Sequence, residues 1–224
     1  AAASGWELPE ELRMLREMTR RFMENEVKPV EDKVPYDAYK VPDEDLARLR
    51  EKARSLGLWF VQSPAQYGGA GLSVLGQCVV AEEAAKCRMG AYTAACDAFG
   101  YDLPNIIYRG TEEQIQKYAV PTIERGERTF VAISEPSGGA DPARAIQTRA
   151  ELKGDRYVVN GTKLWITSAK DSRWGVLFAR TDKAAGRGGV TAFVIEKDWP
   201  GLSMSEVPVI RSYYPYELHF EDFE

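Results

Sequence analysis

The chain has 224 residues, of which 44% are hydrophobic and 28% charged, a composition typical of a globular protein with a sizeable core. Its formal net charge of −5 argues against nucleic acid as a partner, because phosphate contacts require a basic surface. We find no apolar run of the roughly 18–20 residues that a membrane helix needs and no targeting segment, so we expect no membrane and a cytoplasmic location. His219 is the only histidine, and the three cysteines lack metal-type spacing. We therefore expect neither a histidine-based triad nor a metal site.

The first half of the chain has helical periodicity. Apolar residues recur about every 3.6 positions over 12–27 and again over 43–55, where Gly57 follows as the expected helix stop. Residues 74–87 are also predicted to be helical. Thr111, with Gln114 three residues later, has the pattern of a capping box that opens a further helix.

After Thr129 the apolar pattern changes from helical to alternating. Asn160-Gly161 predicts a hairpin turn between two strands, and 153–155 predicts a second turn. Residues 186–189 are expected to form a loop. The fold class is therefore α+β, with an N-terminal all-α helical domain, residues 1–128, followed by an antiparallel β-barrel or sandwich domain, residues 129–224. The other strands are expected at 176–179, 190–195 and 216–220.

The most informative stretch lies between Val131 and Thr167. It contains V-A-I-S-E-P-S-G-G-A-D at 131–141 and N-G-T-K-L-W-I-T at 160–167. Ser134 and Thr167 are short hydroxyl donors that each end an apolar run, 137–140 is a loop of small residues, and Trp165 is a flat ring. A flavin needs donors for its ring edge, a cradle for its pyrophosphate and a wall for its face. Each feature alone is ordinary in a β domain, but their order and spacing together favour a flavin site.

This stretch resembles the flavin-binding signature of the acyl-CoA dehydrogenase family, whose pattern is T-E-P-x-x-G-S-D followed by N-G-x-K-x-W-I-T. The resemblance extends over most of the chain. Further matching segments lie at 56–58, 63–72, 110–118, 189–194, 200–202 and 218–222.

The resemblance implies an FAD-dependent acyl-CoA dehydrogenase, in which the flavin accepts a hydride from the β-carbon of the thioester and passes electrons to an electron-transferring flavoprotein. It implies acyl-CoA contacts at Ala140 and, in the helical half, at Tyr92, Thr93, Cys96 and Phe99, for which helix packing is an equal alternative. The implied cofactor contacts are Val131, Ile133, Ser134, Gly139, Ala140, Trp165, Ile166 and Thr167.

The chain departs from the family pattern in three ways. Ser134 replaces a threonine and keeps the hydroxyl, whereas Ala140 replaces a serine and loses a hydrogen bond worth about 0.5–1.5 kcal/mol. The family's catalytic base is a glutamate in C-terminal helices that would follow Glu224. We therefore assign no catalytic residue, and we expect the motif acids Glu135 and Asp141 to be structural.

Three explanations stay open for the missing helices. The chain is a piece of an ordinary acyl-CoA dehydrogenase, a half-subunit of a heteromeric enzyme whose partner chain carries the helices, or a non-catalytic flavin- or acyl-CoA-binding scaffold. A related acyl-CoA oxidase or flavin monooxygenase also fits, and the acyl chain length is not determined. We expect a homo-oligomer or a partner chain, because an apolar patch of Tyr213, Tyr214, Tyr216 and Phe220 is expected to favour association.

Overall fold

The computed structural model describes residues 7–36, 38, 40–88, 97–138, 140–210 and 214–224. By its contacts the chain divides into two compact units, Ala1–Asp102 with Ile123–Gly126, and Leu103–Thr122 with Glu127–Glu224. The domain boundary expected near residue 129 stays a prediction. Within the described residues, no helix is both long and apolar enough to cross a membrane.

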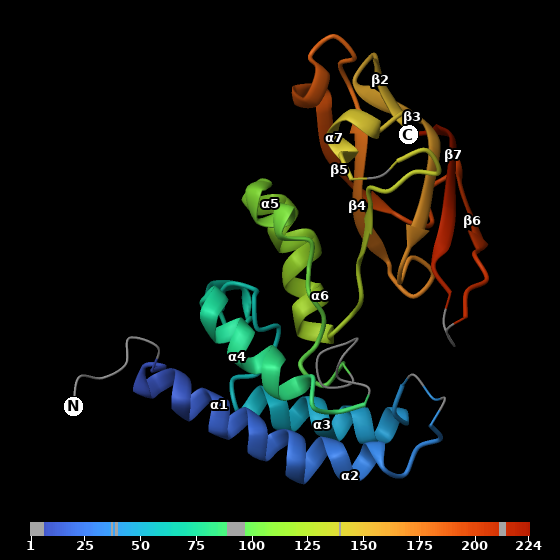
Figure 1. Cartoon of the computed structure of the whole chain (residues 1–224). Helices are drawn as coiled ribbons and strands as arrows, with labels where there is room; N and C mark the ends of the chain where they lie inside the picture. The colour runs from blue at the N-terminus through green and yellow to red at the C-terminus, as the bar shows by residue number, and fades with distance from the viewer. Residues whose placement is uncertain (1–6, 37, 39, 89–96, 139, 211–213) are drawn as a thin grey trace. The chain divides into compact units, whose positions relative to one another are not determined.

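The first unit is helical (Figure 1). Helix α1 has two acidic residues in its first turn and two arginines in its last turn, and these charges interact favourably with the helix dipole. Helix α3 likewise has three acidic residues in its first turn. The hydroxyl of Ser73 accepts a hydrogen bond from the Gly76 amide at the start of α4. This helix ends at Ala84, three residues before the predicted end. The elements are α1 Glu10–Phe22, the π-helical η1 Met23–Val27, α2 Lys28–Glu31, α3 Asp43–Ser55, the 3₁₀ turn η2 Ala65–Tyr67 and α4 Val74–Ala84.

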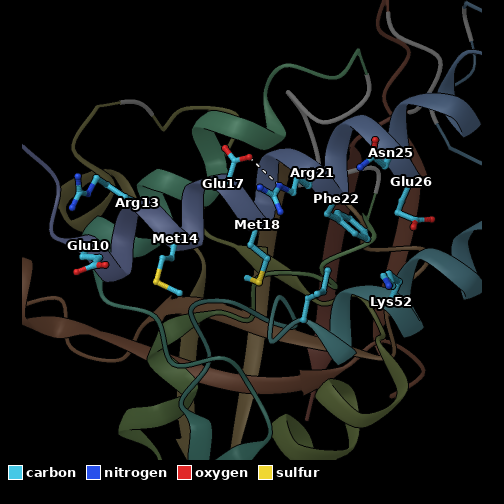
Figure 2. Close-up of a pocket in the computed structure, with 11 residues that line it drawn as sticks. Glu10, Arg13, Met14, Glu17, Met18, Arg21, Phe22, Asn25, Glu26 and Lys52 are labelled. Atoms are coloured by element: carbon cyan, nitrogen blue, oxygen red, sulfur yellow. Dashed lines mark hydrogen bonds and ion pairs between the residues drawn. The ribbon is translucent and has the colours of Figure 1, made fainter.

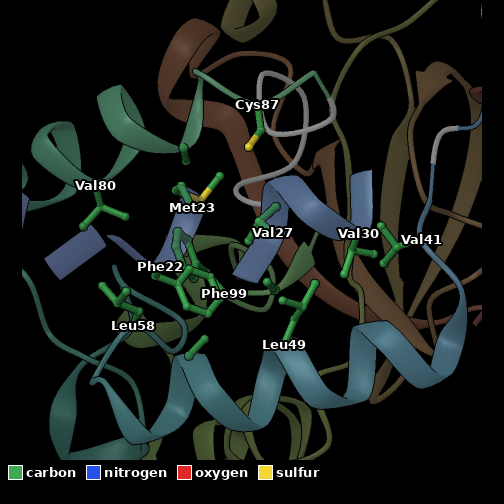
Figure 3. Packing of buried hydrophobic residues seen from close by; sticks show 13 residues of the cluster. Phe22, Met23, Val27, Val30, Val41, Leu49, Leu58, Val80, Cys87 and Phe99 are labelled. Carbon is green, nitrogen blue, oxygen red and sulfur yellow. The ribbon is translucent and has the colours of Figure 1, made fainter. Parts of the chain in front are cut away.

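The helical unit has its own apolar core, formed by the faces that the periodicity predicts. Figure 3 shows Phe22 beside Phe99, and their ring centroids are 5.5 Å apart. Leu49 of α3 and Val80 of α4 complete the same cluster. A buried carboxylate, Glu83, adds a polar link, because it pairs with Arg20 of α1 at 3.0 Å and with Lys86 at 2.5 Å.

The second unit combines a short helical segment with a curled seven-stranded sheet (Figure 1). The capping box at Thr111 and Gln114 is confirmed, with both reciprocal hydrogen bonds present. The helical elements are η4 Asn105–Arg109, α5 Glu112–Gln114, the π-helical η5 Ile115–Ala119, the first part of α6 Val120–Arg125, α7 Pro142–Ala145 and η6 Gly186–Gly189. The strands are β1 Phe130–Ala132, β2 Arg149–Lys153, β3 Arg156–Ile166, β4 Trp174–Arg180, β5 Val190–Glu196, β6 Leu202–Glu206 and β7 Tyr216–Phe223.

The strand order is β1-β4-β2-β3-β7-β6, and β5, which lies off this path, pairs with β4. Most pairs are antiparallel, as expected, and the α+β class with helices before a curled sheet is confirmed. The sheet is nevertheless mixed, because β1 runs parallel to β4 and β2 meets β4 in one parallel pair. These parallel pairs join strands that are distant in sequence, so local turn motifs do not predict them.

The predicted hairpin turn at Asn160-Gly161 is wrong. β3 runs without interruption through both residues, and the turn to β2 lies at Gly154-Asp155, where the second turn was predicted. Gly161 instead sits at an irregularity in the pairing with β7, and a Cβ built on it would lie 2.6 Å from the Thr148 hydroxyl. Gly161 is therefore needed for a β-bulge and for the close approach of Thr148, rather than for a turn. Both are common reasons for a glycine within a strand.

The expected apolar patch near the C-terminus is also wrong in part. Phe220 is buried in the core of the sheet, where its ring packs against Phe223 at 5.3 Å. Tyr216 is half-buried with its hydroxyl bonded to Glu206, and Tyr214 is exposed. Tyr213 lies outside the described residues. The alternation along β7 turns Phe220 inward, so the patch cannot include it.

Candidate functional site

The motif residues gather where β1 and β3 end. The chain leaves β1 at Ala132, and the carbonyl of Ser134 accepts a hydrogen bond from the Leu164 amide at 2.9 Å. Residues 131–134 and 163–167 are 30 positions apart in sequence, and this bond joins them directly. The two halves of the predicted site are thus neighbours in the sheet unit.

A buried ion pair lies beneath this junction. The Lys163 ammonium is 2.8 Å from a Glu135 carboxylate oxygen, and their side chains are 0% and 3% exposed. Lys163 also donates to the Ile133 carbonyl at 3.1 Å. The amides of Gln147 and Thr148 donate to the two Glu135 oxygens at 2.6 and 3.0 Å. Burial raises the pKa of Glu135, but the hydrogen bonds from Lys163 and from these amides outweigh it and hold that pKa below its ordinary value.

Trp165 faces outward because β3 carries a bulge. The register with β7 shifts between Lys163 and Ile166, so that both of these side chains point into the unit. Trp165 between them adopts φ +65°, a left-handed conformation that is rare for a bulky residue. Its indole is 53% exposed. The bulge thus directs a large ring toward the surface, a known use of such irregularities near functional sites.

The other predicted cofactor contacts fall into three groups. Val131, Ser134, Ala140 and Thr167 are exposed, and Ile133 is half-buried. Ile166 is buried in the core of the sheet unit, so a cofactor could contact its backbone alone. Gly139 lies outside the described residues.

The small-residue loop after the first motif segment is held in place by arginines. The Gly138 amide donates to the Glu135 carbonyl, so it is used within a turn. Asp141 pairs with Arg187 at 2.5 Å, and this hydrogen bond lowers the pKa of Asp141. Arg180 of β4 donates to the carbonyls of Ala143, Ile146 and Gly186. Both motif acids therefore have structural partners, as expected.

The predicted acyl-CoA contacts in the helical half are mostly outside the described residues. This holds for Tyr92, Thr93 and Cys96. Phe99 is described and lies in the helical core against Phe22, which gives it a packing role. Its contact with a substrate stays a prediction.

The described part of the chain also contains two grooves away from the motif residues. The first, of about 850 Å³, runs along α1 between residues such as Met14, Met18 and Lys52, and Figure 2 shows both methionines on its wall. The second, of about 760 Å³, lies in the sheet unit between the helical segment at 106–118 and β5. None of the motif residues lines either groove, and the described residues hold no cluster of three His, Cys, Asp or Glu side chains that could bind a metal.

Helices followed by a curled sheet define an α+β fold of the type seen in acyl-CoA dehydrogenases. Family models agree over nearly the whole chain. Residues 9–127 match "Acyl-CoA dehydrogenase, N-terminal domain" and residues 131–223 match "Acyl-CoA dehydrogenase, middle domain". The chain belongs to the acyl-CoA dehydrogenase family.

Individual relatives support this assignment. The short-chain specific acyl-CoA dehydrogenase of Clostridium acetobutylicum is 36% identical over 96% of this chain and 56% of its own length. The mitochondrial isovaleryl-CoA dehydrogenase of Pongo abelii is 32% identical over 96% of this chain and 51% of its own. A glutaryl-CoA dehydrogenase from Mycobacterium smegmatis, solved in complex with FADH2, has a TM-score of 0.74 and 25% identity over 96% of this chain and 54% of that one. The chain thus spans about half the length of the relatives it matches.

Sequence reasoning missed the organisation beneath the site. Lys163 was recognised as a motif position and Glu135 as structural, but their pairing and the amides of Gln147 and Thr148 were not predicted. The signal in the sequence is that Glu135 and Lys163 each lie near apolar residues, because charged residues are seldom buried unless they are paired.

Proposed function

We propose that this chain binds FAD through its sheet unit and forms the flavin-binding half of an enzyme that dehydrogenates an acyl-CoA thioester between its α- and β-carbons. The observation that carries the proposal is the junction of 131–134 with 163–167. It places an exposed indole and two exposed hydroxyl-bearing residues on strand ends held by a buried ion pair. A large flat ring and nearby donors are what the edge and face of an isoalloxazine require.

Each residue has a specific part in this proposal. Trp165 would cover one face of the flavin ring, and Ser134 and Thr167 would donate hydrogen bonds to its edge. Gly139 and Ala140 would lie along the pyrophosphate. FAD, when bound, supplies the hydride acceptor. The Thr167 hydroxyl is the donor best suited to stabilise charge that develops on the ring during transfer.

The proton of the substrate α-carbon needs a base, and neither motif acid suits that role. The Glu135 carboxylate already accepts three hydrogen bonds beneath the surface, and Asp141 is paired with Arg187. The family resemblance implies that the base is a glutamate of C-terminal helices, and we propose this role for neither motif acid. Electron-transferring flavoprotein is the proposed acceptor. The relatives differ in their named substrates, so we propose no particular acyl group.

The proposal is tested by titrating the chain with FAD and following flavin absorbance and fluorescence. Trp165→Ala should weaken binding about 2- to 13-fold, since an aromatic stacking contact contributes roughly 0.5–1.5 kcal/mol. Tyr157→Ala, which removes another exposed aromatic at the opposite end of β3, is the matched control and should bind as the wild type does. A wild-type chain that shows no saturable FAD binding would refute the proposal.

A further inference from the structure

The Glu135–Lys163 pair lies outside the surface that the proposed function assigns to the cofactor. Both side chains are almost fully buried, and the pair is 2.8 Å apart. Burying two charges is costly, and an apolar pair of similar volume often stabilises a protein as well or better. A charged pair at this position therefore calls for a role beyond general stability.

The partners of the pair indicate what that role is. Lys163 donates to the Ile133 carbonyl, which lies one residue before Ser134. Glu135 accepts from the amides of Gln147 and Thr148, where the chain enters β2. The pair therefore ties together the exit of β1, the entry of β2 and the last part of β3.

Besides the contacts of the pair, the described residues show a direct backbone hydrogen bond between the two surface segments, from the Leu164 amide to the Ser134 carbonyl. A single bond restrains the relative orientation of the two segments less than two bonds do, although Ala132 and Ile166 share the apolar core of the unit. The Lys163 contact to Ile133 gives a second point of attachment, and Glu135 fixes Lys163 from the other side. Two attachment points define the relative orientation of the segments that carry Ser134 and Trp165.

We propose that the Glu135–Lys163 pair is the positioning element of the flavin site. It does not touch the cofactor. It holds the backbone of 133–134 against 164–165, so that the indole and the hydroxyls are presented together before the ring binds. Such preorganisation matters because small displacements of binding groups cost affinity and rate. This inference rests on the proposed function.

The test compares Glu135→Gln, Lys163→Met and the double variant Glu135→Gln/Lys163→Met with the wild type. FAD affinity is measured under conditions where urea unfolding curves show each protein to be folded. We expect the folded variants to bind FAD about 10-fold more weakly or worse. The visible circular dichroism of the bound flavin should also change, because it reports how the ring is held. If either single variant does not fold, the double variant decides, since it leaves no unpaired buried charge.

The matched control is Glu83→Gln in the helical unit. Glu83 is an equally buried carboxylate that pairs with Arg20 and Lys86, far in sequence from the motif. This variant should lose stability yet keep wild-type FAD affinity and the wild-type flavin spectrum. The inference is overturned if the folded pair variants match the wild type in both readouts, or if Glu83→Gln weakens FAD binding to the same degree. A wild-type chain that binds no FAD would instead refute the proposed function, so the two failures are distinguishable.

Discussion

At the scale of single residues, Trp165 is the most unusual member of the site. It combines a left-handed backbone, which costs an ordinary residue roughly 1–2 kcal/mol, with a half-exposed indole. Strain of this kind persists where the surrounding structure imposes it, and it concentrates at functional sites. Here the bulge between Lys163 and Ile166 imposes it, because both of those side chains are fixed inside the unit.

The strain at Trp165 can be measured by comparing two truncations. Trp165→Gly and Trp165→Ala both lose the indole, so their difference reports on the backbone alone. We expect the glycine variant to be more stable by about 0.5–1 kcal/mol, because glycine adopts positive φ without penalty. Tyr157 lies in the same strand without a positive φ, so Tyr157→Ala should be more stable than Tyr157→Gly. Urea unfolding measures all four variants, and an alanine variant at 165 that is as stable as the glycine variant would show that the backbone there is relaxed.

Glu135 predicts a pH dependence of stability. Its folded-state pKa lies below its ordinary value of 4.5, so its contribution is fully present above about pH 4.5 and is lost as pH falls through the folded-state pKa. Wild type should exceed Glu135→Gln in unfolding free energy by about 3–5 kcal/mol at pH 7, the usual cost of breaking a buried pair. The gap should shrink below pH 4.5, because the carboxyl of the unfolded wild type takes up a proton there while the folded carboxyl stays ionised down to its lower pKa.

Urea unfolding of both proteins between pH 3.5 and 7 tests this expectation. Other acids, such as Asp141, are common to both proteins and cancel in the difference. A gap that is constant across this pH range would contradict the low pKa of Glu135.

The exposure of the candidate site residues is predictable from the sequence, whereas the buried contacts beneath them are not. The chemistry expected of Ser134, Trp165 and Thr167 needs an open surface, and each is exposed, while their contacts with a cofactor stay a prediction. The pairing of Glu135 with Lys163 depends on how β1, β2 and β3 meet, which local spacing does not encode. Ile166 shows the same difficulty, because its inward orientation depends on the bulge.

At the scale of elements, β3 explains where sequence reasoning failed. Asn-Gly between apolar runs is a strong hairpin signal, yet β3 continues through Asn160 and Gly161. Tertiary context decides the outcome, because Asn160 bonds to Asp222 of β7 and Thr148 leaves no room for a side chain at 161. Helices were predicted more accurately, and α3 has the expected bounds, since its period and caps are local properties.

Gly161 gives a direct test of this explanation. Gly161→Ala places a Cβ 2.6–2.8 Å from Thr148 atoms, so we expect a loss of about 1–3 kcal/mol in unfolding free energy, typical of overpacking. The control is Gly188→Ala, which meets no atom within 4 Å and should change stability by less than about 0.5 kcal/mol. Thermal or urea unfolding measures both, and a neutral Gly161→Ala would mean that β3 and Thr148 are farther apart than described.

At the scale of the whole molecule, the switch from helical to alternating periodicity predicted the α+β class correctly. It could not predict that β1 and β4 run parallel, because that pairing closes a long segment of chain. It also could not predict that residues 103–122 group with the sheet unit by contacts. These features depend on long-range packing, whereas periodicity reports on neighbouring residues.

If the catalytic base is not among these 224 residues, they should have little dehydrogenase activity on their own. With FAD bound, they should oxidise acyl-CoA thioesters negligibly, since general base catalysis alone is typically worth about 10²–10⁴ in rate. Dye reduction with butyryl-CoA measures this, and the full-length short-chain specific enzyme of Clostridium acetobutylicum, 36% identical to this chain, serves as the positive control. Turnover by the 224 residues within tenfold of that enzyme would require a base among them.

We propose that the junction of 131–134 with 163–167 holds the flavin ring. A crystal structure of the chain grown with FAD tests it most directly. We expect isoalloxazine density against the Trp165 indole, with the Thr167 hydroxyl within hydrogen-bonding distance of the ring and the Glu135–Lys163 pair intact beneath it. Flavin density bound elsewhere on the chain, with Trp165 and Thr167 left in solvent, would contradict it.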